Sequence, residues 1–267
     1  MVDWMIEVLT NFKCDDQTFF LTVSMMDRYF KGCKDRKEVK DLHSIGVTAM
    51  FVGSKYEDIF PLKMKTVHEK IVHERVSIQA IKNLEMDMLR TVDYKIHAPT
   101  PLDFLKGFLV DVLGIEILNR AETQQKEEFA LKTNQLAQGK TVEMTDGELP
   151  AAPTAEDQEK VQKFLVEKMA IYLAKMSMHD AELSTRKPSL LAVGAIYVAL
   201  KICEQLKRKE MISPDLVSRL IGVSHMAEDE ILEVSQKVLH LAQNFDKEFP
   251  GLENLKKTHF SIITQLL

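Results

Sequence analysis

The hydrophobic pattern of the chain centres on residues 41–58, where residues 45–52 are apolar or small at nearly every position. A helix without a polar stripe is typical of the centre of a bundle, because other helices can cover it on every side. Gly46, Ala49 and Gly53 are three and four residues apart, so they share one helix face on which a neighbouring backbone can come close. This pattern predicts a buried central helix over residues 41–58.

The same pattern occurs again in the second half of the chain. Residues 191–201 (LAVGAIYVALK) align without a gap on residues 45–55 (IGVTAMFVGSK). The alignment pairs small residues with small residues, an aromatic residue with an aromatic residue, and Lys201 with Lys55. Two copies of one buried helix predict two copies of one helical domain, since an internal repeat marks a repeated structural unit.

Helical periodicity around the two central helices completes a set of about five helices in each half. The expected helices are residues 2–12, 17–30, 41–58, 62–70 and 78–92 in the first half, and residues 102–113, 161–178, 189–206, 213–222 and 224–245 in the second. No segment alternates in the way that a half-buried strand does. The predicted fold class is therefore all-α, with two five-helix domains in tandem.

Proline residues mark the boundary between the two halves. Pro99 ends the segment that precedes it, and Thr100 followed by Pro101 is a strong start for the next helix. We expect an N-terminal domain at residues 1–98, a C-terminal domain at residues 99–246 and a tail at residues 247–267.

An insert of different composition interrupts the second domain. Residues 116–157 are rich in Glu, Gln, Lys, Thr, Ala and Pro. The first half of the insert could form a polar helix. Residues 134–157 hold too few apolar side chains to bury, so they predict a loop.

With 45% hydrophobic and 28% charged residues, the chain of 267 residues has a globular composition and room for two domains. Its formal net charge of −5 argues against a broad surface for nucleic acid or acidic membrane, because such surfaces need a basic face.

We expect no membrane span, since no apolar run reaches about 18 residues. We expect no signal peptide either, since Asp3 and Glu7 interrupt the first apolar stretch. Cys14, Cys33 and Cys203 lack metal spacing and a paired framework, which indicates reduced thiols in the cytosol or nucleus.

Patterns for catalysis, cofactors and metals are missing from the sequence. Gly107 and Gly114 form no phosphate-binding loop, and no Walker or dinucleotide motif occurs. The eight His residues lack the spacing of metal ligands. We therefore expect a protein that is not an enzyme and that carries neither a cofactor nor a metal.

Two charged residues interrupt apolar helix faces. Lys55 follows Phe51 at helical spacing, and Glu85 breaks the apolar stripe of the helix at residues 78–92. One interpretation is a local ion pair, or charged heads that reach water past apolar stems. The other is that both residues lie at the rim of an apolar patch and bind the backbone of a partner protein.

Five motifs stand out along the chain: residues 2–8 (VDWMIEV), 26–30 (MDRYF), 48–61 (TAMFVGSKYEDIFP), 83–101 (NLEMDMLRTVDYKIHAPTP) and 187–199 (KPSLLAVGAIYVA). The first four resemble the cyclin box, most closely that of the mitotic A/B-type cyclins, and the fifth resembles the matching helix of the C-terminal cyclin fold. The resemblance implies two tandem cyclin folds and a regulatory subunit without catalysis of its own. Such a subunit binds and activates a cyclin-dependent serine/threonine kinase in cell-cycle control, here at mitosis, and acts in the nucleus and cytoplasm.

Carried over by position, the resemblance implies a kinase-binding surface. Lys55 and Glu85 would hydrogen-bond the loop that precedes the kinase's movable helix. The hydrophobic surface that presses on this helix would consist of Val52, Tyr56, Leu89, Tyr94 and Ile96. For Val52 and Leu89, a place in the core of the first domain is the alternative interpretation.

The resemblance also implies a second surface, the family's docking patch for kinase substrates or inhibitors. Its residues here would be Met1, Trp4, Glu7 and His43. His43 stands where these cyclins usually have Gln, and Trp4 is equally compatible with simple packing of the first helix. Arg28, in the Asp-Arg-Tyr motif, is expected to pair with an acidic residue of the first helix such as Asp3.

A different function class uses the same architecture. A general transcription factor with two cyclin folds bridges promoter DNA and polymerase, and it needs a basic face on one repeat. The net negative charge favours the kinase regulator, without a nucleic-acid or membrane partner.

Overall fold

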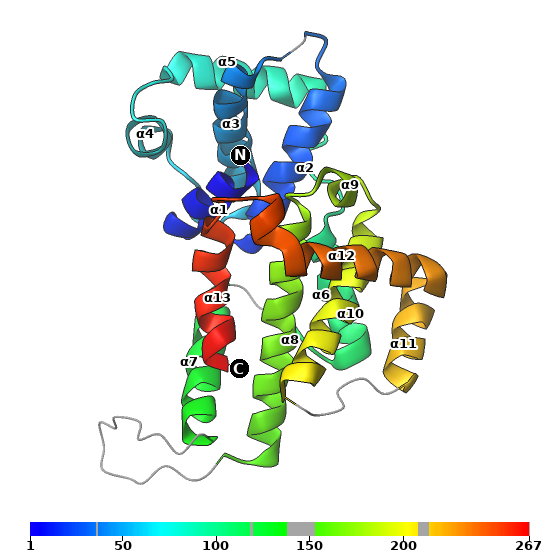
Figure 1. Ribbon diagram of the computed structural model, residues 1–267. Coiled ribbons are helices and arrows are strands. Elements are labelled where there is room, and N and C mark those ends of the chain that lie inside the picture. Colours follow the sequence, from blue (N-terminus) through cyan, green and yellow to red (C-terminus); the bar gives the residue numbers. More distant parts are fainter. Residues whose placement is uncertain (36, 118–119, 138–152, 208–213, 267) are drawn as a thin grey trace, which may run out of the picture. The chain divides into compact units, whose positions relative to one another are not determined.

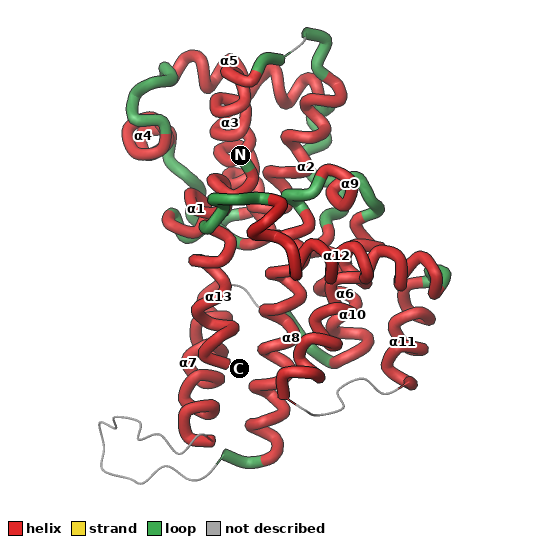
Figure 2. The backbone as a smooth tube through the Cα atoms, in the orientation of Figure 1, coloured by secondary structure: helices red, strands yellow, loops and turns green. Residues whose placement is uncertain are grey.

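The computed structural model describes residues 1–35, 37–117, 120–137, 153–207 and 214–266. In these ranges the chain consists of helices joined by turns and loops, with no strand (Figure 2). The predicted all-α fold class is confirmed.

The chain divides into two compact units. The first unit contains Met1–Asp103 and Gly251–Thr258, and the second contains Phe104–Pro250 and the residues from His259 on. The segment that we assigned to a C-terminal tail, residues 247–267, is therefore shared between the two units.

Local capping fixes where helices of the first unit begin. Its helices are α1 (Val2–Asn11), α2 (Asp16–Gly32), a 3-10 turn (Val39–Asp41), α3 (Leu42–Glu57), α4 (Met64–Thr66) with a following π-helical segment (Val67–Ile71), and α5 (Ile78–Thr91). The Asp15 carboxylate accepts a hydrogen bond of 2.9 Å from the Gln17 amide and caps α2. The Ser77 hydroxyl caps α5 in the same way, through the Ala80 amide at 3.1 Å.

The central helix of the first unit is α3, around which α1, α2 and α5 pack (Figure 1). All residues from 45 to 54 are buried. A Cβ atom added at Gly46 would meet Met1 Sδ at 2.7 Å, and one added at Gly53 would meet Thr22 Oγ1 at 2.7 Å. The small residues thus permit close approach by α1 and α2, which confirms the predicted buried helix and its small-residue face.

The second unit is built around α10, as the repeat predicts. Its helices are α6 (Pro101–Leu113), α7 (Arg120–Ala137), α8 (Ala155–Ser177), α9 (Ala181–Ser184), α10 (Pro188–Lys207), α11 (Pro214–Ser224), α12 (Glu228–Glu248) and α13 (Asn254–Leu266), of which α6 and α13 begin in the first unit. α8 and α12 pack on α10, where a Cβ atom at Gly194 would lie only 2.5 Å from Val234 Cγ1. The two central helices therefore share close packing at small residues.

α10 also corrects one expectation from the sequence. Its window Pro188–Gln205 has a mean hydropathy of 1.2, so by length and composition this helix could cross a membrane. The expectation that no helix is long and apolar enough to span a membrane is therefore not met, although Lys201 and Glu204 interrupt the apolar window. In the fold, 61% of the window is buried, as is usual for the central helix of a bundle.

The insert is more helical than its composition predicts. α7 continues to Ala137, and α8 begins at Ala155, six residues before the helix that we expected from residue 161. Thr154 and Asp157 form a capping box at the start of α8. This added part of α8 is polar, so hydrophobic periodicity did not reveal it. Residues 138–152 of the predicted loop lie outside the described residues.

α13 was not predicted, because its cap comes from the other end of the sequence. Asp3 in α1 is 4% exposed, and its carboxylate accepts hydrogen bonds from the amides of Asn254 (3.2 Å) and Leu255 (3.0 Å). A carboxylate at a helix N-terminus satisfies free amides and interacts favourably with the helix dipole. Asp3 thus holds the start of α13 within the first unit.

Candidate partner-binding site

The last turn of α3 and the middle of α5 bring the two predicted charged residues together. The Lys55 ammonium contacts Glu85 Oε1, with 39% of the Lys55 side chain and 15% of the Glu85 side chain exposed. Lys55 Nζ also lies 4.2 Å from the ring centroid of Phe51, one turn earlier in α3. The local ion pair is present, at a place that solvent still reaches from the Lys55 side.

The five apolar residues of the predicted kinase-binding surface differ in exposure. Tyr56 is 50% exposed and Tyr94 is 59% exposed, whereas Leu89 and Ile96 are half-buried. Val52 is only 2% exposed, which favours its alternative interpretation as a core residue. The two tyrosines therefore offer the most accessible area of the set.

The segment that follows α5 lies against the end of α3. The His97 ring stacks on the Tyr56 ring, with centroids 6.4 Å apart and planes inclined by 22°. The Arg28 guanidinium of α2 donates hydrogen bonds to the carbonyl oxygens of Lys95 and Ile96. The expected partner of Arg28, an acidic residue of α1, is thus replaced by backbone carbonyls, because Asp3 is placed to cap α13.

Sequence reasoning missed exposed apolar residues beside this surface. Ile59 and Phe60 follow Tyr56 by three and four residues and are 87% and 91% exposed. Met86 directly follows Glu85 and is 42% exposed. Large apolar side chains exposed near one another are a common sign of an interaction site. The signal was available, since Ile59 and Phe60 stand between the end of a helix and Pro61, outside any helical stripe.

The residues of the predicted docking patch gather at α1 and the start of α3. The rings of Trp4 and His43 lie 4.9 Å apart with a 36° tilt. Burial, and secondly the positive charge of Arg75, lower the pKa of His43. Glu7 is exposed and accepts a hydrogen bond of 3.3 Å from the Asn254 side chain.

At the repeat position of the second unit, the lysine pairs within its own helix. Lys201, the repeat counterpart of Lys55, contacts Glu204 at 3.3 Å within its own helix. Of these two lysines, Lys55 pairs with a residue of another helix and Lys201 pairs with a residue of its own helix.

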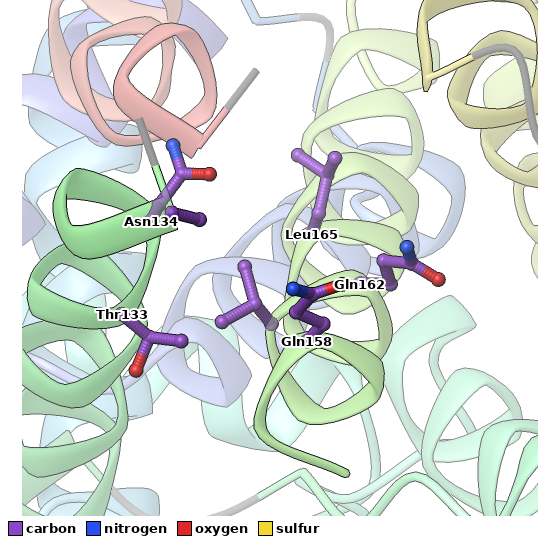
Figure 3. Close-up of a pocket in the computed structure, with 7 residues that line it drawn as sticks. Thr133, Asn134, Gln158, Gln162 and Leu165 are labelled. Carbon is purple, nitrogen blue, oxygen red and sulfur yellow. The ribbon is translucent and has the colours of Figure 1, made fainter. Parts of the chain in front are cut away.

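The cavities of the described residues differ in chemistry, since one between α9 and α12 is lined by charged side chains such as Glu182 and Lys237, whereas another is not. A cavity of about 200 Å³ lies between α7 and α8. Figure 3 shows Thr133 and Asn134 on α7 and Gln158, Gln162 and Leu165 on α8, and the lining of this cavity contains no acidic, basic, His or Cys side chain. Among the described residues, no group of three or more His, Cys, Asp or Glu side chains could hold a metal ion.

Comparison with protein families gives two matches. The model of the cyclin N-terminal domain matches residues 1–97, and the model of the cyclin C-terminal domain matches residues 154–256. The chain belongs to the cyclin family. The Lys55–Glu85 pair lies within the first matched domain.

Relatives of this cyclin include B-type members. It is 33% identical to the G2/mitotic-specific cyclin-B1 of Carassius auratus over 106 residues, which are 40% of this chain and 26% of the relative. It is 34% identical to the S-phase entry cyclin-5 of Saccharomyces cerevisiae over 106 residues, 40% of this chain and 24% of the relative. It is 26% identical to cyclin-B3-1 of Arabidopsis thaliana over 199 residues, 74% of this chain and 37% of the relative. This cyclin thus spans about a quarter to a third of the length of these relatives.

Solved structures share the fold. A viral cyclin from herpesvirus saimiri has a TM-score of 0.57 at 19% identity, covering 89% of this chain and 82% of that chain. A chain of the CAK complex from Chaetomium thermophilum, bound to ATP-gamma-S, has a TM-score of 0.56 at 11% identity, covering 99% of this chain and 69% of that chain. These likenesses confirm the tandem cyclin fold.

Proposed function

We propose that this cyclin binds and activates a cyclin-dependent serine/threonine kinase in cell-cycle control, with mitosis as its stage of action. The observation that carries the proposal is the Lys55–Glu85 pair, which joins α3 to α5, together with the exposed rings of Tyr56, next to Lys55 in the chain, and Tyr94, shortly after the end of α5. Aromatic anchors beside charged groups are the usual composition of an interface centre. Similarity to B-type relatives supports the mitotic stage.

The ion pair leaves capacity for a partner on both side chains. An ammonium group has three donors, and a carboxylate has about four acceptor sites, so one mutual contact does not saturate either. Lys55 can therefore donate to a partner's carbonyl oxygens, and Glu85 can accept from its amides, while the pair persists. Their mutual contact holds both heads in place before binding, which lowers the entropy that association must overcome.

Activation follows if the surface prefers one kinase conformation. A binding partner shifts a conformational equilibrium only by its differential affinity for the two states. In kinases, an inward position of the mobile helix completes the Lys–Glu ion pair that orients ATP phosphates. The surface around Lys55 and Glu85 would hold that helix inward, and this cyclin would itself contribute no group to phosphotransfer.

The test is reconstitution with a panel of cyclin-dependent kinases. Each kinase is mixed with the purified chain, captured, and assayed for phosphorylation of a histone-type substrate. We expect at least one kinase to be retained and to gain activity by orders of magnitude, while the chain alone transfers no phosphate. ATP turnover by the chain alone, or retention of no kinase in the panel, would overturn the proposal.

We further propose that the patch of Met1, Trp4, Glu7 and His43 receives kinase substrates or inhibitors, and that this cyclin acts in the nucleus and cytoplasm. The contact between the Trp4 and His43 rings supports the patch, because it forms a continuous aromatic surface beside the exposed Glu7 carboxylate. Peptide capture by the native chain and by Trp4→Ala tests it. Equal capture by both would contradict the assignment.

A further inference from the structure

The backbone that follows α5 has an unusual local conformation. Asp93 and Tyr94 both lie in the left-handed region, with φ of 55° and 56°. L-residues rarely adopt this region, because Cβ comes too close to the carbonyl oxygen that follows. The Asp93 amide donates to Arg90 O at 3.0 Å, and the Tyr94 amide donates to Leu89 O at 2.8 Å. These bonds close the end of α5 and reverse the chain just before the exposed Tyr94 ring.

A side chain from a different helix holds the next two residues. Arg28 in α2 donates from Nη1 to Lys95 O and from Nη2 to Ile96 O, and its Nε donates to Ser24 O at 3.4 Å. The guanidinium is a rigid planar fork, so it can bind two neighbouring carbonyl oxygens at once, which a lysine ammonium cannot match in geometry. One side chain therefore fixes the position of two consecutive peptide groups.

The segment held in this way carries part of the proposed kinase-binding surface. Tyr94 and Ile96 are two of its apolar members, and His97 joins the segment to α3 by stacking on Tyr56. The turn at the end of α5, the Arg28 contacts and this ring contact tie residues 93–97 to three helices of the first unit. The segment is thus fixed before any partner arrives.

We propose that Arg28 is a positioning residue for the kinase-binding surface: it presets Tyr94 and Ile96 in their docking arrangement by holding the carbonyl groups of residues 95 and 96. This inference rests on the proposed function. It explains why an arginine, and not a lysine, serves at this place. Preorganisation of a binding segment increases affinity because less conformational entropy is lost on association.

The first test measures the segment without any kinase. Hydrogen exchange of the amides of residues 94–97, and trypsin cleavage after Lys95, are followed in the native chain, Arg28→Met and Arg28→Lys. Arg219→Met is the matched control, because Arg219 in the second unit also donates to a backbone carbonyl, that of Asp111, at 3.0 Å. We expect exchange and cleavage to rise about tenfold or more in Arg28→Met, less in Arg28→Lys, and not in the control, as local opening predicts.

The second test measures coupling in kinase binding. Arg28→Met is combined with Tyr94→Ala in one cycle and with Lys55→Ala in another. If Arg28 acts by placing Tyr94, the Tyr94→Ala loss shrinks when Arg28 is already Met, whereas the Lys55→Ala loss keeps its full size. If Arg28 only stabilised the fold, Arg28→Met would lower kinase affinity, but it would not reduce the Tyr94→Ala loss more than the Lys55→Ala loss.

The outcomes separate the two proposals. Native exchange at residues 94–97 in Arg28→Met, or additive losses in both cycles while the native chain binds its kinase, overturns the role of Arg28 alone. Failure of the native chain to bind any kinase overturns the proposed function, and the docking role of Arg28 falls with it. If Arg28→Met does not fold, both measurements are made on Arg28→Lys.

Discussion

The Lys55 ammonium group and the Glu85 carboxylate form an ion pair between α3 and α5, with 39% and 15% of the two side chains exposed. Ion pairs at this level of exposure are screened by water and salt and contribute little to folding stability. A pair that joins the central helix to α5 beside exposed aromatic rings is therefore better explained by recognition than by stability. Its absence at the repeat position Lys201 is consistent with this explanation.

Removal of the Lys55 or the Glu85 side chain should weaken kinase binding while leaving the stability of the fold almost unchanged. In Lys55→Ala and Glu85→Ala, we expect the free energy of unfolding to change by under about 1 kcal/mol, because the pair is partly solvated. Kinase affinity should fall by about 2 kcal/mol or more per site, a factor of about 30. Denaturant unfolding and binding titration check the two values, with Lys201→Ala as the control.

A charge swap sharpens this prediction. Lys55→Glu combined with Glu85→Lys keeps an internal pair but presents the opposite polarity to the fixed donors and acceptors of a partner backbone. We expect the swapped chain to fold normally and to leave the kinase inactive. Normal activation by the swapped chain would remove these two residues from the binding site without affecting the fold.

Two linker replacements of different length should show whether the insert itself, or only the helix ends on either side of it, contributes to the stability of the second unit. Replacement of residues 138–152 by a short Gly/Ser linker should leave stability and kinase affinity unchanged. Replacement of residues 134–157 should destabilise the second unit by about 1 to 3 kcal/mol, because it removes the Thr154 capping box and the 2.8 Å bond from Asn134 to the Gln265 carbonyl. Thermal unfolding of both variants tests this. A tenfold loss of kinase affinity in the shorter replacement would instead identify the insert as an interface.

Substitution of Asp3 should release the start of α13. Asp3→Ala leaves the amides of Asn254 and Leu255 without their acceptor, which should cost about 1 to 3 kcal/mol at this buried position. Asp3→Asn keeps an acceptor oxygen and should cost less. The measurements are chemical unfolding and trypsin cleavage at Lys256 and Lys257, with Glu74→Gln, a change at an exposed carboxylate elsewhere in the first unit, as the control. Equal cleavage in the native chain and Asp3→Ala would contradict the capping role.

His43 should make the first unit sensitive to mild acid. Its pKa in the folded chain lies below the ordinary value of 6.5, first because burial disfavours the imidazolium and second because Arg75 repels it. As pH falls below 6.5, the unfolded chain therefore binds more protons at this position than the folded chain, and stability falls. The loss is complete once pH has passed below the folded pKa.

The variant His43→Gln isolates this contribution. We expect the native chain to lose more stability than His43→Gln between about pH 7.5 and about pH 5.5, measured by denaturant unfolding. An identical pH profile for the two chains would show that His43 does not carry the effect.

The two central helices and the tandem arrangement could be predicted from the amino-acid sequence alone. Burial of α3 and α10 follows from local composition, because a helix without a polar stripe is stable only inside a bundle. Local caps such as Ser77 could be located in the same way, since a cap and its target amide are only a few residues apart. The first six residues of α8 could not be predicted from periodicity, because a capping box and the Lys160–Glu156 ion pair stabilise them in place of an apolar face.

The partners of the polar side chains, in contrast, depend on how the helices pack. Asp3 caps a helix that begins at Asn254, and Arg28 binds carbonyls at residues 95 and 96, although the sequence suggested that these two side chains bind each other. Lys55 and Glu85 were identified from sequence, but their mutual contact depends on how α3 and α5 pack. The physical reason is one of range: hydrophobic periodicity repeats within a helix, whereas a hydrogen bond needs two atoms within about 3 Å, and chain folding alone sets that distance for residues far apart in sequence.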